Sequence, residues 1–242
     1  MVTPAPDFAG FRPAALRFLR GLARNNRRDW FEPRRAIYDE ELRLPMRALL
    51  SEVDVRLATI APELVADPRR SLFRIHRDVR FSRDKSPYKT NVGFWINHRS
   101  LGGPAGTVVH GGAGLYFHIA PPPDGCFVAA GIWMPPPPVL ARIREGLTDD
   151  LPGFVRALRT LRPHFGALSG EAKLTRLPRG FGPSHPAAQW LLYRSFTVSR
   201  PVPPALLGRA DLPDRLARLY RPAIPLVRWI NTVLGCPPAA RR

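Results

Sequence analysis

Apolar residues recur at helical spacing in two parts of the chain, one near each end. Near the start they predict helices over 13–25 and 29–60. We expect Pro45 to kink the second of these helices, because proline has no backbone N–H to donate. Further helices are expected after a run of four prolines, over 139–146, 151–161, 187–192 and 211–234.

The middle of the chain has the short apolar runs that are typical of strands. Strands are expected over 72–81, 88–97, 114–120 and 126–134, with one more over 193–200. Because the connections between neighbouring strands are short, antiparallel pairing is favoured over parallel strands joined by helices. The pattern therefore predicts an α+β fold, with a central, mainly antiparallel sheet of about five strands flanked by N-terminal and C-terminal helices.

The domain organisation follows from the same pattern. The sequence shows no internal repeat and no long linker, and 242 residues lie within the range of one domain. We therefore expect a single domain over 1–242. Its parts would be helical over 8–62, mainly β over 71–135, and helical with one further strand over 139–236.

Composition excludes several classes of protein. With 45% hydrophobic residues the chain is too apolar to be disordered, and no apolar stretch is long enough to cross a membrane. Its start lacks the apolar segment of a signal peptide. Two cysteines are too few for a disulfide framework or a four-ligand zinc site. We therefore expect a cytoplasmic protein with no membrane contact.

The charge of the chain is strongly positive. Lys and Arg together number 37 against 19 Asp and Glu, a net charge of +18, and three of the cations are lysines. Such a charge is compatible with nucleic acid or another polyanion as a partner. The arginines are spread along the whole chain, however, so charge alone does not distinguish a polyanion from an anionic small molecule.

The segment 74–91 is the most informative part of the sequence, because it concentrates charged side chains around a short turn. A hairpin that pairs Phe81 with Tyr88 would place Ile75 opposite Phe94 on an apolar face. The reverse face would then be charged. Its charged residues, with those of the turn, are Arg74, His76, Asp78, Arg80, Arg83, Asp84, Lys85 and Lys89, whereas Arg77 falls among the apolar positions of the first face.

This hairpin would set two cations, Arg80 and Lys89, directly opposite each other. Like charges in that position are unfavourable, so a negative group must compensate them. Asp78 or Asp84 could supply it from within the segment, or a bound anion could. Arginine in particular suits bidentate binding of phosphate or carboxylate.

Our leading hypothesis is therefore a site for a phosphate- or carboxylate-bearing ligand on this hairpin. If the site is catalytic, Asp78 or His76 would act as general base. No known catalytic motif occurs in the chain, so whether it is an enzyme is left open. The expected ligand-binding residues are Arg74, Arg77, Arg80, Asp84, Lys85, Tyr88 and Lys89.

Two alternatives compete with that hypothesis. One is a nucleic-acid or polyanion-binding module that uses the distributed arginines and exposed aromatic side chains, for which Trp95, Tyr116 and Trp133 are candidates. The other is a salt-bridge network that only fixes the sheet. An enclosed pocket would favour the small-ligand site, and a broad basic surface would favour the polyanion-binding module. Complete mutual pairing of the charges would favour the salt-bridge network.

The remaining chemistry-bearing residues give weaker signals. His76, Asp78 and His118 could supply three metal ligands if their strands are neighbours, but no local spacing demands it, and we expect neither a metal nor a cofactor. Cys126 begins an apolar strand and is expected to be buried. The segment 25–31 reads as a helix cap followed by core aromatics, or alternatively it brings Asn26 to the rim of the basic surface together with Arg27.

Several segments resemble a widespread bacterial and fungal family, the domain of unknown function 2461 family. The resemblance rests on 8–11, on 25–31 and above all on 77–89, which has the pattern Arg-Asp-x-Arg-Phe…Asp-Lys-x-x-Tyr. Residues 114–119 and 131–133 fit the same family pattern, so the resemblance spans nearly the full length. It implies no activity or residue role. It marks as positions to test Asp78, Arg80, Asp84, Lys85 and Tyr88.

Overall fold

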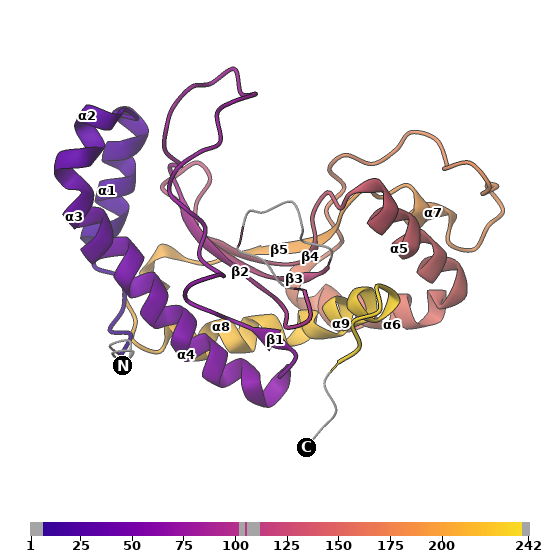
Figure 1. Cartoon of the computed structure of the whole chain (residues 1–242). Helices are drawn as coiled ribbons and strands as arrows, with labels where there is room; N and C mark the ends of the chain where they lie inside the picture. The colour runs from indigo at the N-terminus through magenta and orange to yellow at the C-terminus, as the bar shows by residue number, and fades with distance from the viewer. Residues whose placement is uncertain (1–6, 102–104, 106–111, 239–242) are drawn as a thin grey trace.

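An antiparallel sheet of five strands, in the order β1-β2-β3-β4-β5, forms the centre of the fold (Figure 1). The structure is a computed structural model that describes residues 7–101, 105 and 112–238. The strands are β1 (Leu64–Val65), β2 (Val92–His98), β3 (Gly114–Ile119), β4 (Phe127–Ile132) and β5 (Phe196–Pro201). Helices precede and follow the sheet, so the predicted α+β class, strand number and antiparallel pairing are confirmed.

The helices lie close to the predicted ranges. They are α1 (Pro13–Arg24), α2 (Arg28–Phe31), α3 (Arg35–Tyr38), α4 (Leu44–Ile60), α5 (Pro137–Asp149), α6 (Leu151–Phe165), α7 (Ala188–Leu191), α8 (Leu212–Tyr220) and α9 (Ile224–Val233). A π-helical turn, Asp39–Arg43, comes directly before α4, whose second residue is Pro45. The hydrogen bonding thus changes from π-helical to α-helical just before Pro45, the residue that lacks a backbone N–H. None of the helices within the described ranges is long and apolar enough to span a bilayer.

The two faces of the sheet differ in what covers them. On one face Ile96, Leu115, Ala130 and Val198 lie side by side across β2 to β5 and are buried. Helices α6, α8 and α9 pack beneath this face (Figure 1). The other face, which we call the open face, is less buried and lies between the N-terminal helices and α5. It carries the row Trp95, Tyr116, Ala129 and Ser199.

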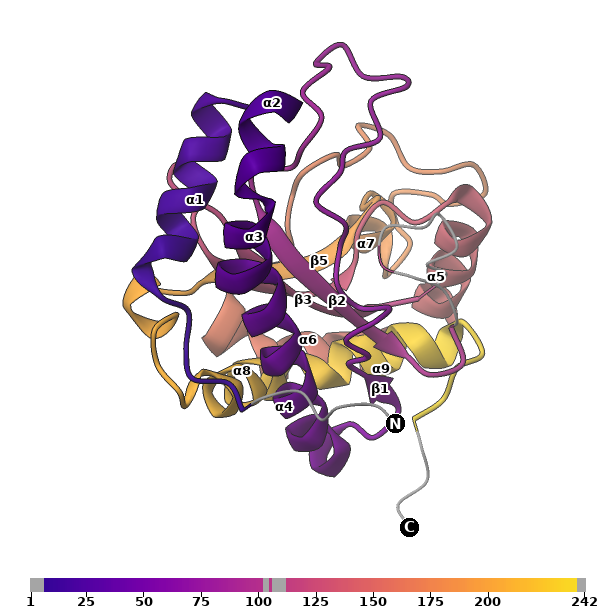
Figure 2. The same cartoon turned by 60° about the vertical axis from the view of Figure 1, so that its left-hand side comes forward.

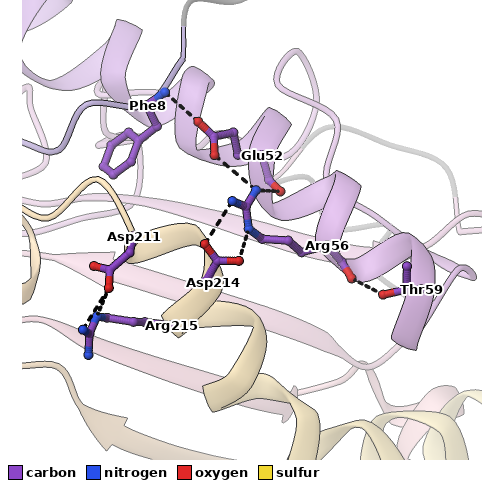
Figure 3. A network of polar contacts seen from close by, with 7 residues as sticks. All are labelled: Phe8, Glu52, Arg56, Thr59, Asp211, Asp214 and Arg215. Atoms are coloured by element: carbon purple, nitrogen blue, oxygen red, sulfur yellow. Dashed lines mark hydrogen bonds and ion pairs between the residues drawn. The ribbon is translucent and has the colours of Figure 1, made fainter.

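Polar contacts connect the N-terminal helices to the C-terminal ones (Figure 3). On α4, Arg56 donates from Nε and Nη2 to the carboxylate of Asp214 on α8, at 2.7 and 3.1 Å. Glu52, one turn earlier, accepts a hydrogen bond of 2.7 Å from the backbone N–H of Phe8. Buried apolar residues of the helices and the sheet form one continuous cluster. This is what a single domain requires, although the domain division itself stays a prediction.

The hairpin expected from 72–81 and 88–97 does not form in the predicted register. Only isolated bridges join the two segments, and they pair Leu72 with Phe94 and His76 with Tyr88. The predicted pairing of Phe81 with Tyr88 is therefore wrong. His76 lies four positions after Leu72 whereas Phe94 lies six positions after Tyr88, so the pairing is irregular and no strand forms over 72–81. We call the segment 72–91 the arm.

Candidate functional site

The arm extends the β2 edge of the sheet and ends in an exposed tip. Figures 1 and 2 show the tip reaching past α2, away from the strands. Its backbone remains loosely paired, since Arg77 donates its N–H to the carbonyl of Pro87 and Lys89 donates to that of Ile75, at 2.9 and 2.8 Å. The charged residues predicted to form one site are divided by this geometry into three groups.

The first group lies at the tip and consists of cations and acids that bind each other. Arg80 holds Asp78 with two hydrogen bonds, Nε to Oδ1 at 3.0 Å and Nη2 to Oδ2 at 2.7 Å. Arg77 forms an ion pair with Asp84. Asp84 also accepts a hydrogen bond of 2.9 Å from the backbone N–H of Ser86. The acids that could compensate the cations from within the segment thus serve as their partners.

The tip is open to solvent, and its acids are strongly held in the ionised form. The Asp78 side chain is 54% exposed. Hydrogen bonds from Arg80 lower the pKa of Asp78 to about 2, and hydrogen bonds from Ser86 and then Arg77 lower the pKa of Asp84. A carboxylate with so low a pKa is a weak base near neutral pH, so this environment gives Asp78 no support as a general base.

Lys85 binds backbone atoms of the tip. Its ammonium group donates to the backbone carbonyl of Val79 at 3.0 Å and lies 3.5 Å from that of Arg80. These contacts connect the two sides of the turn, which is not a regular hairpin turn. Phe81, in the same turn, is 95% exposed and does not lie on an apolar face as the alternating pattern predicted.

The second group lies at the base of the arm and centres on Tyr88. The side-chain amide of Asn26 binds the Tyr88 backbone at both ends, donating to its carbonyl at 2.8 Å and accepting from its N–H at 3.0 Å. The Tyr88 ring stacks on Phe31 with centroids 4.1 Å apart, and its hydroxyl donates to Glu32 at 3.0 Å. His76 lies across the ring, with centroids 5.2 Å apart. The two segments 25–31 and 77–89 therefore meet at Tyr88.

These contacts make Tyr88 a structural residue. Only 1% of it is exposed, and burial followed by the hydrogen bond to Glu32 raises its pKa. Asn26 attaches the arm to the connection between α1 and α2. Arg27, its predicted companion at the rim of a basic surface, pairs instead with Asp29 at 2.9 Å. Sequence reasoning missed Glu32 altogether. It lies 56 residues from Tyr88, and no local pattern could have indicated the contact.

The third group is Lys89, on the side of the arm that faces the open face of the sheet. Lys89 is half-buried, and its ammonium lies 5.0 Å from the centroid of the Phe73 ring. In the part of the chain that the structure describes, this ammonium has neither a carboxylate within 4.0 Å nor a hydrogen-bond acceptor. Burial, and then repulsion from Arg74, lowers the pKa of Lys89.

A row of aromatic rings, Phe73, Tyr116, His118 and Phe127, continues from Lys89 across the open face. Phe73 meets Tyr116 edge-on at 5.8 Å, and His118 stacks on Phe127 at 4.5 Å. The Tyr116 hydroxyl is hydrogen-bonded to Nδ1 of His118 at 2.9 Å. Glycine makes room for this row, because a Cβ on Gly93 would lie 3.0 Å from the Tyr116 hydroxyl.

Two buried nitrogen atoms at this face lack a partner among the described residues: Nε2 of His118 and Nε1 of Trp95. Buried polar atoms are ordinarily hydrogen-bonded, so each of them is a potential contact for a bound molecule or water. Burial lowers the pKa of His118, which favours the neutral imidazole. If Tyr116 donates to Nδ1, then Nε2 carries the proton and acts as a donor.

The structure does not assemble the metal ligands that the sequence considered. His76 and Asp78 lie on the arm while His118 lies on β3, and residues 7–101, 105 and 112–238 contain no group of three or more ligating side chains arranged around a metal. Cys126 is buried as predicted, and its burial raises the pKa of the thiol. A thiol in that state is a poor nucleophile.

Comparison with known proteins identifies the family of the chain and no further relative. No curated protein and no solved structure matches the sequence. A family model described as "Conserved hypothetical protein (DUF2461)" matches residues 14–229, which include all the strands, the arm and most of the helices. The chain therefore belongs to the DUF2461 family.

Proposed function

We propose that the protein binds a phosphate- or carboxylate-bearing ligand whose charged group lies at Lys89 and Arg74. The observation that carries this proposal is the half-buried Lys89 ammonium without a carboxylate partner among the described residues. Removing an ammonium from water costs free energy, and a neighbouring cation adds repulsion. A bound oxyanion would offset both costs with charge-assisted hydrogen bonds.

The aromatic row supports a ligand that is larger than a free ion. Phe73 and Tyr116 offer ring surface beside Lys89, and Nε2 of His118 offers a polar contact further along. Apolar walls with a few fixed polar groups are the usual composition of a small-molecule site. We therefore infer an organic anion with a flat or apolar part rather than inorganic phosphate alone.

In this proposal the tip of the arm has a structural task. Its ion pairs and the Lys85 contacts hold the turn in shape, and Asn26 holds the base at the connection between α1 and α2. The binding residues are then Arg74 and Lys89. The wider predicted set, and the catalytic roles of Asp78 and His76, stay predictions that the ion pairing at the tip does not favour.

A comparison of two lysine variants tests the location of the site. We expect Lys89→Met to weaken binding of phenyl phosphate by about 10- to 100-fold, the effect of losing a hydrogen bond to a charged group. Isothermal titration calorimetry measures this affinity. Phenyl phosphate is expected to bind more tightly than inorganic phosphate, because its ring can lie on Phe73 and Tyr116.

Lys85→Met is the matched control, because it makes the same change of charge at the tip. Retained binding in Lys85→Met together with loss in Lys89→Met supports the proposal. Equal affinity of Lys89→Met and the wild-type protein overturns it. Loss in Lys85→Met alone would place the ligand at the tip, as the sequence first suggested. Circular dichroism of each variant checks that the fold is kept.

A second candidate function is suggested by Phe81 at the tip. Its ring is 95% exposed, and the guanidinium of Arg80 lies 5.9 Å from its centroid, with Arg83 and Lys85 nearby in the sequence. Exposed aromatic rings between cations are typical of proteins that bind single-stranded nucleic acid. The net charge of +18 favours such a partner as well.

Substitution of this ring tests the second candidate. We expect Phe81→Ala to weaken binding of a labelled single-stranded oligonucleotide by about 5- to 100-fold, the range for loss of one stacked base. The slope of affinity against salt should stay the same, because no charge is removed. Trp133→Ala, which removes a side chain that is 72% exposed and lies just after β4, shows whether the effect is specific to the tip. Unchanged binding by Phe81→Ala in a fluorescence anisotropy titration would exclude stacking at the tip.

A further inference from the structure

A second uncompensated cation, Arg144 on α5, lies away from the arm. Its Nε and Nη2 atoms are both buried, and neither has a hydrogen-bond partner among the described residues. A guanidinium N–H that is removed from water without an acceptor is costly, and such groups are rare in folded proteins. Two of them on one side chain call for a ligand or for ordered water.

The unpartnered atoms of Arg144 form the edge with which other arginines of this protein bind carboxylates. Arg56 uses Nε and Nη2 to hold Asp214 at 2.7 and 3.1 Å. Arg228 uses the same two atoms to hold Glu63 at 2.6 and 3.2 Å. The geometry of this edge matches the two oxygens of a carboxylate or phosphate group. Arg144 therefore presents a bidentate oxyanion fork.

The surroundings of Arg144 are positively charged. Burial, and then repulsion from Arg194, lowers the pKa of Arg144, so the two cations are close enough to interact. Lys173 lies beside Tyr193, the residue before Arg194, with its ammonium 4.0 Å from the centroid of the Tyr193 ring. The segment 135–200 contains ten Lys and Arg against four Asp and Glu. None of its cations takes part in an ion pair with the described acids.

The position of this cluster is distinct from that of Lys89. Arg194 comes just before β5, and the hydroxyl of Ser195 accepts a hydrogen bond of 2.9 Å from the N–H of Met134, just after β4. The register of the sheet places these strand ends opposite the end where the arm joins β2. The cluster and the arm base are thus at opposite ends of the sheet.

We propose that Arg144 and Arg194 form a second anion site, independent of the one at Lys89, in which the Nε and Nη2 edge of Arg144 binds the carboxylate or phosphate group of a small molecule. Arg194 supplies the second positive charge. The site is built on α5 and on the segment that enters β5.

The first test is the stability of the free protein. We expect Arg144→Met to raise Tm by about 2–5 °C without any ligand, because it removes two buried N–H groups that lack partners. Arg142→Met on the same helix is the control, and we expect no rise, because Arg142 donates to the carbonyl of Val233 at 3.1 Å. The proposal would be overturned if Arg144→Met lowered Tm by more than Arg142→Met does, because the Arg144 guanidinium would then have hydrogen-bond partners in the free protein.

The second test is ligand binding, with inorganic phosphate and succinate as the two probes. Both salts raise Tm to some extent by exclusion from protein surfaces, so the informative quantity is the difference between variants. We expect Arg144→Met to lose most of the Tm rise given by one probe, and the responding probe tells phosphate from carboxylate. Lys89→Met should keep the part of the rise that Arg144→Met loses, which separates the second site from the first.

Arg218→Met controls for a basic hollow elsewhere in the molecule, a space of about 290 Å³ whose lining includes Arg200, Arg215 and Arg218. We expect it to retain the rise in Tm. If Arg144→Met responds to both probes as the wild-type protein does, or if only Arg218→Met loses the response, the site is not at Arg144 and the proposal fails.

Discussion

Tyr88→Ala is expected to lower the free energy of unfolding by about 3–5 kcal/mol, the range for removing a large aromatic side chain from a core. Tyr88 is 1% exposed and stacks on Phe31, so its loss leaves a cavity at the joint between the arm and α2. Glu32 also loses a hydrogen-bond donor. For a chain of this size the corresponding fall in Tm is about 10–15 °C.

The conservative variant Tyr88→Phe separates packing from hydrogen bonding. It keeps the ring on Phe31 and removes only the hydroxyl that donates to Glu32, so we expect a loss of about 1 kcal/mol. Urea unfolding followed by circular dichroism measures both variants. Similar and small losses for Tyr88→Ala and Tyr88→Phe would contradict the stacked, buried position of the ring.

Arg228→Met is expected to cost about 3–5 kcal/mol at pH 7, because it leaves a buried carboxylate without its cation. The Glu63 side chain is 2% exposed, and Arg228 holds it with two hydrogen bonds. Arg228 also donates to the carbonyl of Ile60 at 3.0 Å, at the end of α4. The substitution therefore disconnects α9 from the segment that leads into β1.

The loss in Arg228→Met depends on pH in a way that identifies its cause. In the wild-type protein burial alone would raise the pKa of Glu63, but the hydrogen bond from Arg228, together with a backbone hydrogen bond and nearby positive charge, outweighs burial, and the pKa is lowered. That contribution to stability is present above the ordinary glutamate value of 4.5 and disappears as pH falls through the lowered value. Without Arg228, burial raises the pKa of Glu63. The loss of stability in Arg228→Met is therefore largest near neutral pH, and it shrinks as the pH falls toward 4.5.

Urea unfolding at pH 7 and pH 4.5 measures this difference. We expect the gap between wild type and Arg228→Met to shrink at the lower pH. The double variant Arg228→Met/Glu63→Gln should recover part of the loss at pH 7, since it removes the buried charge. A gap that is the same at both pH values would mean that lost packing, not the stranded carboxylate, is responsible.

Much of the fold was predictable because it depends on local periodicity. The helical spacing over 13–25 predicts α1, and the short apolar runs over 114–120 and 126–134 predict β3 and β4 with small errors at their ends. The strand β1 was missed. It consists of Leu64 and Val65 only, within a connection rich in turn residues, and its pairing with Asn97 and His98 leaves no periodic signal.

The arm could not be predicted from periodicity because non-local contacts determine its shape. Residues 72–81 alternate as a strand should, yet Tyr88 is positioned by Asn26 and Glu32, which lie 62 and 56 residues away. The tip is shaped by ion pairs such as that of Arg77 with Asp84, and many pairings of its charges are compatible with the sequence. Only the three-dimensional arrangement decides which of them form.

For the same reason the sequence predicted which segment carries the candidate site but not which of its side chains bind one another. The sequence placed Lys85 and Lys89 together in one group of cations. The structure divides them, since Lys85 donates to the backbone carbonyls of the tip whereas Lys89 lies half-buried on Phe73. Arg144 could not be singled out as a site residue from the sequence, because an arginine on an amphipathic helix resembles any solvent-exposed arginine until its burial is known.

The pKa of Lys89 is the most direct test of the central claim, that this ammonium is an uncompensated cation awaiting an anion. The chain has three lysines, Lys85, Lys89 and Lys173, so a sample labelled with ¹³Cε-lysine gives three resonances that variants at the other two positions assign. We expect Lys89 to titrate below the ordinary lysine value of 10.5 in the free protein, and its pKa to rise when phenyl phosphate is added. A pKa at or above 10.5 that phenyl phosphate leaves unchanged would contradict the account.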